Sequence, residues 1–122
     1  MRKAVLLAAL LMAAPLRTSA APTPAEGTAS WYGEGHRGRL MANGQRFDPN
    51  QLTAASWFYP LGTKVRVILK GRSARNVVVT ITDRGPSREL VKKHRLIDLS
   101  QAAFKRIADP SLGLVTVRLE VN

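Results

Sequence analysis

The chain has 122 residues, no cysteine and a formal net charge of +11 at pH 7. Without cysteine it holds neither a disulfide nor a lipid-modified N-terminal cysteine, so its domain depends on a hydrophobic core. The length suits one small domain with a single core, and we expect no second domain within it.

The first 20 residues have the pattern of a secretory signal peptide. Arg2 and Lys3 precede an apolar run over residues 4–14, and Thr18 and Ala20 are the small residues of a cleavage site. The run is shorter than the roughly 20 apolar residues that cross a bilayer, so a stable membrane anchor is the weaker alternative. We expect cleavage after Ala20 and a protein that is periplasmic or secreted.

Removal of this segment takes away three basic residues and no acidic one, so the net charge falls from +11 to +8. A basic exported protein meets anionic polymers of the cell wall. Nucleic acid is the weaker partner class, because the sequence has none of the motifs of nucleic-acid-binding folds. His36 and His94 are isolated, and no cluster of ligands accompanies them, so we expect no metal and no other cofactor.

The first half of the mature chain predicts short strands joined by turns. A flexible Pro/Ala-rich leader is expected over residues 21–26, followed by a strand over 28–33 in which aromatic and small residues alternate. Asn43-Gly44 is a turn dipeptide, and the segment 47–50 is a second turn or the start of a short helix. The segment 52–56 then returns to the core.

Two further segments predict an antiparallel hairpin. Residues 64–69 alternate basic and aliphatic side chains, and residues 76–83 are rich in β-branched residues. Gly85-Pro86 ends the second strand, which places Asp83 at a strand end, where a carboxylate suits acid–base chemistry. The alternative is that Asp83 pairs with Arg84 or caps the loop.

The last third predicts a basic loop, a strand over 95–100, a helix over 101–108 and a strand over 114–121. Ser100 is suited to cap the helix, and Phe104 and Ile107 share one of its faces. Five or six short strands with one or two short helices predict a mainly β fold, a small barrel rather than alternating strands and helices.

Several motifs, in their order and spacing, resemble those of the rare lipoprotein A family. They are GTASWYG at 27–33, ANG at 42–44, FD at 47–48, LTAA at 52–55, PLGT at 60–63, DRGP at 83–86 and IDLS at 97–100. The resemblance implies a six-stranded double-psi β-barrel over residues 27–122, related to expansin and barwin domains. It also implies a peptidoglycan lytic transglycosylase that prefers glycan strands without stem peptides.

The resemblance implies a site as well. Asp83 is the expected catalytic acid and then base, and Asp48 is the expected helper. Asp98, within an apolar strand, is expected to be a structural hydrogen-bonding group, with a catalytic role as the secondary alternative. Such an enzyme protonates the glycosidic oxygen and then removes the proton of the C6 hydroxyl, so one carboxyl serves both steps, whereas hydrolases usually need two. An acid near neutral pH needs burial or neighbouring negative charge, so we expect Arg84 to point away from Asp83. The substrate-binding candidates are Gln45, Ser56, Tyr32, Asn43, Arg84 and Trp57.

Two positions depart from the pattern of the family. Gln45 stands where many members carry glutamate, and Ser56 stands where many carry histidine. Gln45 hydrogen-bonds a sugar but transfers no proton at neutral pH. The alternative function is therefore a non-catalytic, expansin-like module that binds glycan strands. In either case we expect Asp48, Gln45 and Ser56 to converge on Asp83. The expected partners are peptidoglycan strands and, as a further candidate, cell-division proteins. We expect the protein to be a monomer.

Overall fold

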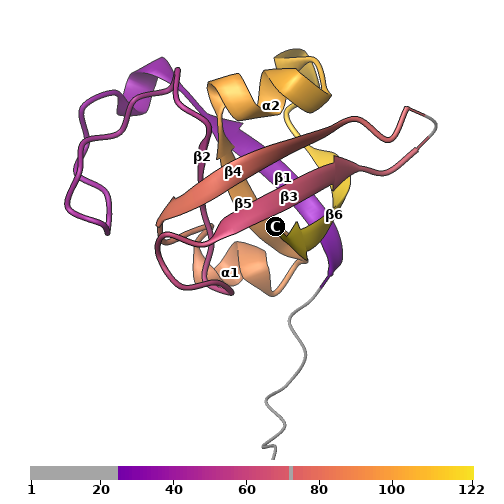
Figure 1. Ribbon diagram of the computed structural model, residues 1–122, viewed down its shortest axis with the longest axis horizontal. Coiled ribbons are helices and arrows are strands. Elements are labelled where there is room, and N and C mark those ends of the chain that lie inside the picture. Colours follow the sequence, from indigo (N-terminus) through magenta and orange to yellow (C-terminus); the bar gives the residue numbers. More distant parts are fainter. Residues whose placement is uncertain (1–24, 72) are drawn as a thin grey trace, which may run out of the picture.

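The computed structural model describes residues 25–71 and 73–122. Six strands form one closed barrel in the order β1-β5-β2-β4-β3-β6 (Figure 1). The strands are β1 (Glu26–Tyr32), β2 (Thr53–Ala55), β3 (Lys64–Leu69), β4 (Asn76–Asp83), β5 (Arg95–Ser100) and β6 (Val115–Val121); the helices are α1 (Arg88–Val91) and α2 (Gln101–Ile107), with 3-10 turns η1 (Glu34–His36) and η2 (Pro110–Leu112). The predicted mainly β barrel is confirmed. The predicted signal peptide, residues 1–20, lies outside the described residues.

The barrel is mixed, which brings distant parts of the chain together. β1 pairs in parallel with β5, and β2 pairs in parallel with β4, while the other neighbours are antiparallel. Parallel neighbours need long connections. The connection between β1 and β2 projects from the side of the barrel toward which β4 runs (Figure 1). The predicted hairpin is present as β3 and β4, with Val65 opposite Val79 and Val67 opposite Val77.

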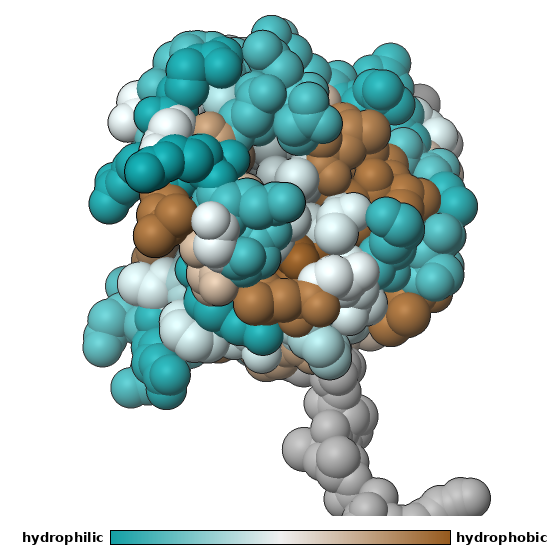
Figure 2. Space-filling view, turned by 60° about the vertical axis from the view of Figure 1, so that its left-hand side comes forward, coloured by the Kyte–Doolittle hydropathy of each residue, from teal (hydrophilic) through white to brown (hydrophobic). Residues whose placement is uncertain are grey.

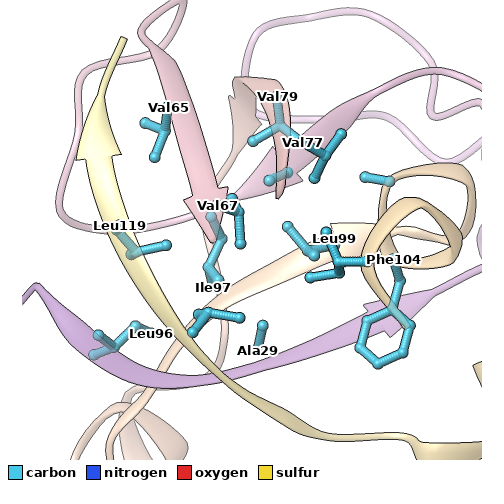
Figure 3. Close-up of a cluster of buried hydrophobic side chains, with 14 of the residues drawn as sticks. Ala29, Val65, Val67, Val77, Val79, Leu96, Ile97, Leu99, Phe104 and Leu119 are labelled. Carbon is cyan, nitrogen blue, oxygen red and sulfur yellow. The ribbon is translucent and has the colours of Figure 1, made fainter. Parts of the chain in front are cut away.

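The core fills the barrel with alternate residues of the strands. Side chains from all six strands contribute to it. Phe104 reaches in from α2 (Figure 3). Ser100 accepts a hydrogen bond from the backbone N–H of Ala103 at 3.2 Å, so the predicted helix cap is confirmed. Val65 and Val67 are fully buried on alternate positions of β3, and Ile97 and Leu99 on alternate positions of β5, where Leu96 and Ser100 are buried as well.

The structure corrects two details and decides between two alternatives at a third. β1 begins at Glu26, the last residue of the expected leader. The expected basic loop contains one helical turn, α1, because the N–H groups of Leu90 and Val91 both donate to the carbonyl of Ser87; a single turn is too short for hydrophobic periodicity to reveal it. The segment 47–50 forms a turn and no helix. No helix in the described part of the chain has the length and apolar character to cross a membrane.

Candidate active site

A row of four residues crosses neighbouring strands on one face of the sheet. Ser30 of β1 lies opposite Asp98 of β5, Asp98 lies opposite Ala55 of β2, and Ala55 lies opposite Asp83 of β4. Residues in register on adjacent strands present their side chains to the same face. Neighbouring strands lie about 4.8 Å apart, so the backbones at Asp83 and Asp98 are about 10 Å apart, with only the methyl group of Ala55 between them.

A bulge in β4 brings Asp83 into this row. Ala54 pairs with Ile81, but the next residue, Ala55, pairs with Asp83, so Thr82 is the extra residue. Without it, Ala55 would lie opposite Thr82. Bulges of this kind re-aim a side chain where a strand ends.

Asp83 is held at the end of β4 by main-chain groups. Its Oδ1 atom accepts hydrogen bonds from the backbone N–H of Ala42 at 2.9 Å and of Arg84 at 2.8 Å. The guanidinium of Arg84 points elsewhere, as predicted, because its Nη1 atom donates to the carbonyls of Ser56 and Tyr59, both at 2.7 Å. Asp83 therefore does cap its loop, but it forms no ion pair with Arg84. Its Oδ2 atom has no hydrogen-bond donor within the described residues.

Asp98 is the second carboxyl of the row. Its Oδ1 atom accepts a hydrogen bond from the Ser30 hydroxyl, so the expected structural role is present. Burial raises the pKa of Asp98, against the lowering effects of the Ser30 hydrogen bond and of the charges of Arg95 and His36. Asp98 also lines a cavity together with Asp83, which favours the role in the site that was only the secondary expectation for it. The signal was its place between Ile97 and Leu99, whose burial turns Asp98 away from the core.

Two adjoining cavities open beside these carboxyls. The first, of about 230 Å³, is lined by Tyr32, His36, Arg39, Leu40, Met41, Phe47 and Asp83. The second, of about 180 Å³, is lined by Tyr32, His36, Ala55, Asp83, Arg84 and Asp98. On the side of the molecule that carries the connection between β1 and β2, hydrophobic patches lie between hydrophilic side chains (Figure 2). Such a mixture of apolar walls and a few polar groups is typical of small-molecule sites.

Tyr32 joins the two cavities. Its ring stacks on Phe47 with centroids 4.4 Å apart and meets the edge of His36 at 5.4 Å. The Tyr32 hydroxyl is buried and has no hydrogen-bond partner in the described part of the chain. Burial, followed by the charges of Asp83 and Asp98, raises the pKa of Tyr32 far above its usual value. The hydroxyl is therefore a neutral donor without a protein partner, which suits recognition of a sugar oxygen.

His36 was missed as a site residue. It contributes to both cavities, four residues after Tyr32 and at the end of η1. The available signal was its closeness in the sequence to Tyr32, since η1 begins two residues after β1 ends. Within residues 25–71 and 73–122, no group of three or more His, Cys, Asp or Glu side chains is arranged to hold a metal ion.

Five predicted site residues line neither of these cavities: Asp48, Gln45, Ser56, Asn43 and Trp57. Asp48 accepts from the N–H of Asn50 at 2.9 Å and faces Arg37 at 3.5 Å. Gln45 is exposed and pairs with Asn43 at the Asn-Gly turn, through Nδ2 of Asn43 at 3.1 Å. Local turn hydrogen bonds thus occupy both residues.

Ser56 approaches Asp83 only through its backbone. Its N–H donates to the carbonyl of Asp83 at 3.0 Å, while its buried hydroxyl accepts from the N–H of Phe58 at 3.1 Å. The expected convergence of Asp48, Gln45 and Ser56 on the Asp83 carboxyl is therefore absent. Of the predicted site residues, the structure brings together Asp83, Tyr32 and Arg84.

Comparison with known proteins places this chain in a family. The family model described as "Lytic transglycolase" matches residues 24–119. The chain is similar to the "Probable endolytic peptidoglycan transglycosylase RlpA" of Synechocystis, with 46% identity over 95 residues, 78% of this chain and 28% of the relative. This chain thus spans less than a third of that relative's length.

Two solved structures are similar in fold. The Streptomyces papain inhibitor has a TM-score of 0.57 and 28% identity, over 80% of this chain and 96% of the inhibitor. A mutant of the Clavibacter michiganensis expansin, solved in complex with cellohexaose, has a TM-score of 0.59 and 18% identity, over 80% of this chain and 50% of the expansin.

Proposed function

Because the chain belongs to the lytic transglycolase family, with its double-psi β-barrel domain, we propose that it is an endolytic peptidoglycan transglycosylase. It cleaves the bond between N-acetylmuramic acid and N-acetylglucosamine and leaves 1,6-anhydromuramyl ends. The observation that carries this proposal is the row in which Asp83 and Asp98 flank Ala55 and face one cavity. We further propose that it acts outside the cytoplasm, where this substrate lies.

Asp83 carries the proton in both steps. Its protonated carboxyl donates to the glycosidic oxygen while the bond from that oxygen to C1 breaks. The resulting carboxylate then accepts the proton of the C6 hydroxyl as the C6 oxygen bonds to C1 of the same sugar. The proton on Asp83 is thereby restored and no water is consumed. The two N–H groups on Oδ1 orient the carboxyl, and Oδ2 is the oxygen left for the substrate.

Asp98 and Tyr32 serve the sugar around the breaking bond. The transition state resembles an oxocarbenium ion, and a carboxylate across the row from Asp83 stabilises its positive charge. The Tyr32 hydroxyl, which has no partner among the described residues, donates to a sugar oxygen. The two small cavities accommodate sugar residues without large branches, which supports a preference for strands that lack stem peptides.

The test is cleavage of sacculi by the protein purified after expression of the full chain. Intact and amidase-treated sacculi are incubated with it, and mass spectrometry detects 1,6-anhydromuramyl products. Asp83→Asn keeps an oxygen for both N–H donors but transfers no proton, so activity should fall about 10²–10⁴-fold. Asp109→Asn, at an exposed turn where Asp109 accepts from the N–H of Ser111, is the matched control and should leave activity unchanged. Equal activity of Asp83→Asn and the wild type would contradict the proposal.

A non-catalytic glycan-binding module is the second candidate. It is supported by Gln45 and Ser56, whose side chains transfer no proton near neutral pH, and by the fold shared with the expansin. The same assay separates the two, since a binding module sediments with sacculi and releases no 1,6-anhydro product. We also propose that the protein is a monomer and that cell-division proteins recruit it.

A further inference from the structure

A third cavity, of about 470 Å³, lies between the segment after β2 and helix α1. We call it the Trp57 groove; it is lined by Trp57, Phe58, Arg88, Val91 and Lys92. It shares no lining residue with the two cavities beside Asp83. Its floor is aromatic and aliphatic, and both of its charged residues are basic.

Trp57 is exposed and yet held in place. Its Nε1 atom donates to the carbonyl of Pro86 at 2.6 Å, and the guanidinium of Arg88 lies 4.6 Å from the centre of its ring. In spite of these contacts, 41% of Trp57 is exposed to solvent. A rigid, exposed indole offers a large contact surface at little cost in conformational entropy. Its fixed orientation therefore favours a flat partner such as a sugar ring.

The rim of the groove attracts an anion. Arg88 and Lys92 form none of the ion pairs found among the described residues. Glu89, the acidic residue of the same helix, does not line the groove. Two cations over an apolar floor complement a ligand that carries both an apolar face and a carboxylate.

Hydrogen bonds tie the Trp57 groove to the cleavage site. The segment 56–59 and the loop 83–86 are joined by the bond from Ser56 N to Asp83 O at 3.0 Å and by Arg84, which binds two carbonyls of that segment. Trp57 adds its bond to Pro86 at the far end of the same loop. A ligand in the groove therefore lies one short loop away from the Asp83 carboxyl.

We propose that the Trp57 groove is a second glycan subsite, which binds an N-acetylmuramic acid residue of the same strand through its free lactyl carboxylate. The sugar face packs on Trp57 and Phe58, and the carboxylate lies between Arg88 and Lys92. This carboxylate is free only where the stem peptide has been removed, so the groove selects stripped strands. The identity of the glycan rests on the proposed function. The Trp57 groove is concave, which favours a saccharide over a membrane surface as its ligand.

Binding, measured apart from cleavage, tests this subsite. Isothermal titration of the full-chain protein uses a muramic-acid-containing tetrasaccharide with free carboxylates, the same sugar with amidated carboxylates, and an acidic glutamate peptide. Lys92→Gln should weaken binding of the free carboxylate form about tenfold and leave the amidated form unchanged, because a charge-assisted hydrogen bond contributes more than about 1.4 kcal/mol. Trp57→Ala should weaken both sugars, and Trp57→Phe should restore part of the loss. Lys105→Gln, on an exposed position of α2, is the matched control and should change neither.

The outcomes separate this inference from the proposed function. Carboxylate-dependent binding without 1,6-anhydro products would sustain the subsite and remove the enzymatic proposal. Cleavage together with equal binding of the free and amidated sugars, or binding insensitive to Lys92→Gln, would overturn the subsite. Binding of the glutamate peptide as tightly as the sugar would also overturn it, since the groove would then be a general anion site. Thermal melting of each variant confirms that it is folded.

Discussion

Two regions of the barrel differ in how they treat polar side chains: the region packed against α2, and the region around the row that contains Asp83. At α2, the side chains of Ala103, Phe104 and Ile107 are all buried against the core, and the polar Ser100 is used as a helix cap. Beside the row, one cavity is lined by the residues that carry two carboxyls, Asp83 and Asp98, and by Tyr32, whose hydroxyl is buried. The first part gains stability from burial, whereas the second keeps polar groups poorly compensated.

This difference shows where the molecule concentrates stability and where it concentrates chemistry. A buried carboxyl and an unpaired buried hydroxyl each cost free energy of folding. They persist in a domain of this size because the closed barrel and α2 stabilise the fold independently of the row. Substitutions at α2 should therefore change stability alone, and substitutions in the row should change activity more than stability.

Phe104→Ala should have the largest effect. Phe104 is fully buried and packs 6.4 Å from Trp31, centroid to centroid, so its loss leaves a cavity in the core. We expect a loss of about 3–5 kcal/mol in the free energy of unfolding, measured by urea denaturation. Lys105→Gln, the next residue of α2 and exposed, should change it by less than about 0.5 kcal/mol. Retention of wild-type stability in Phe104→Ala would show that α2 does not stabilise the barrel.

Asp98→Asn should affect activity next most strongly. Loss of the second carboxylate should reduce cleavage of sacculi about 10²-fold, since it removes one electrostatic stabiliser of the transition state. Asparagine still accepts from the Ser30 hydroxyl, so the fold is kept.

The same variant tests the pH dependence of stability. Because the folded pKa of Asp98 is raised above its unfolded value, the folded wild type binds more protons than the unfolded chain between the two values. Its stability therefore decreases as the pH rises through that window, and Asp98→Asn removes this decrease. In denaturation curves from pH 3 to pH 8, the free energy of unfolding of Asp98→Asn should increase relative to that of the wild type as the pH rises. The opposite trend would mean that burial does not dominate at Asp98.

Tyr32→Phe should lower activity without lowering the stability of the fold. Within residues 25–71 and 73–122 the hydroxyl has no hydrogen-bond partner, so its removal should leave the melting temperature unchanged or slightly higher. Activity should fall up to about tenfold, the equivalent of one hydrogen bond to the sugar. Tyr59→Phe is the matched control, because Tyr59 is buried in the core and lines neither cavity beside Asp83. Unchanged activity in Tyr32→Phe would remove the hydroxyl from the site.

Gly85→Ala should produce the smallest change. An added Cβ would lie 3.3 Å from the Ala55 Cβ and 3.4 Å from the Asp98 Oδ2, so the side chains of the row would have to shift by a few tenths of an ångström. We expect a loss of a few-fold in activity and of less than about 1 kcal/mol in stability. Gly35→Ala, where the added Cβ meets no atom within 4 Å, is the control. A larger effect of Gly35→Ala would show that the row is not the sensitive element.

Much of the fold could be predicted from the sequence because it depends on local rules. Alternation of buried and exposed residues identified β3 and β4 as a hairpin, and the spacing of Ser100 and Phe104 identified the capped helix α2. The Gly85-Pro86 dipeptide likewise predicted that Asp83 stands at the end of a strand, and β4 does end at Asp83. Each of these features involves residues that are close in the sequence.

Only the tertiary structure decided which polar residues share a site. Asp98 and Asp83 meet one cavity because β5, β2 and β4 are neighbours in a closed barrel with parallel pairs, and because a bulge at Thr82 sets the register. Conversely, Asp48 and Gln45 are engaged by hydrogen bonds of their own turns. Local periodicity determines which face of a strand a residue occupies, but the free energy of closing the barrel determines which strands become neighbours.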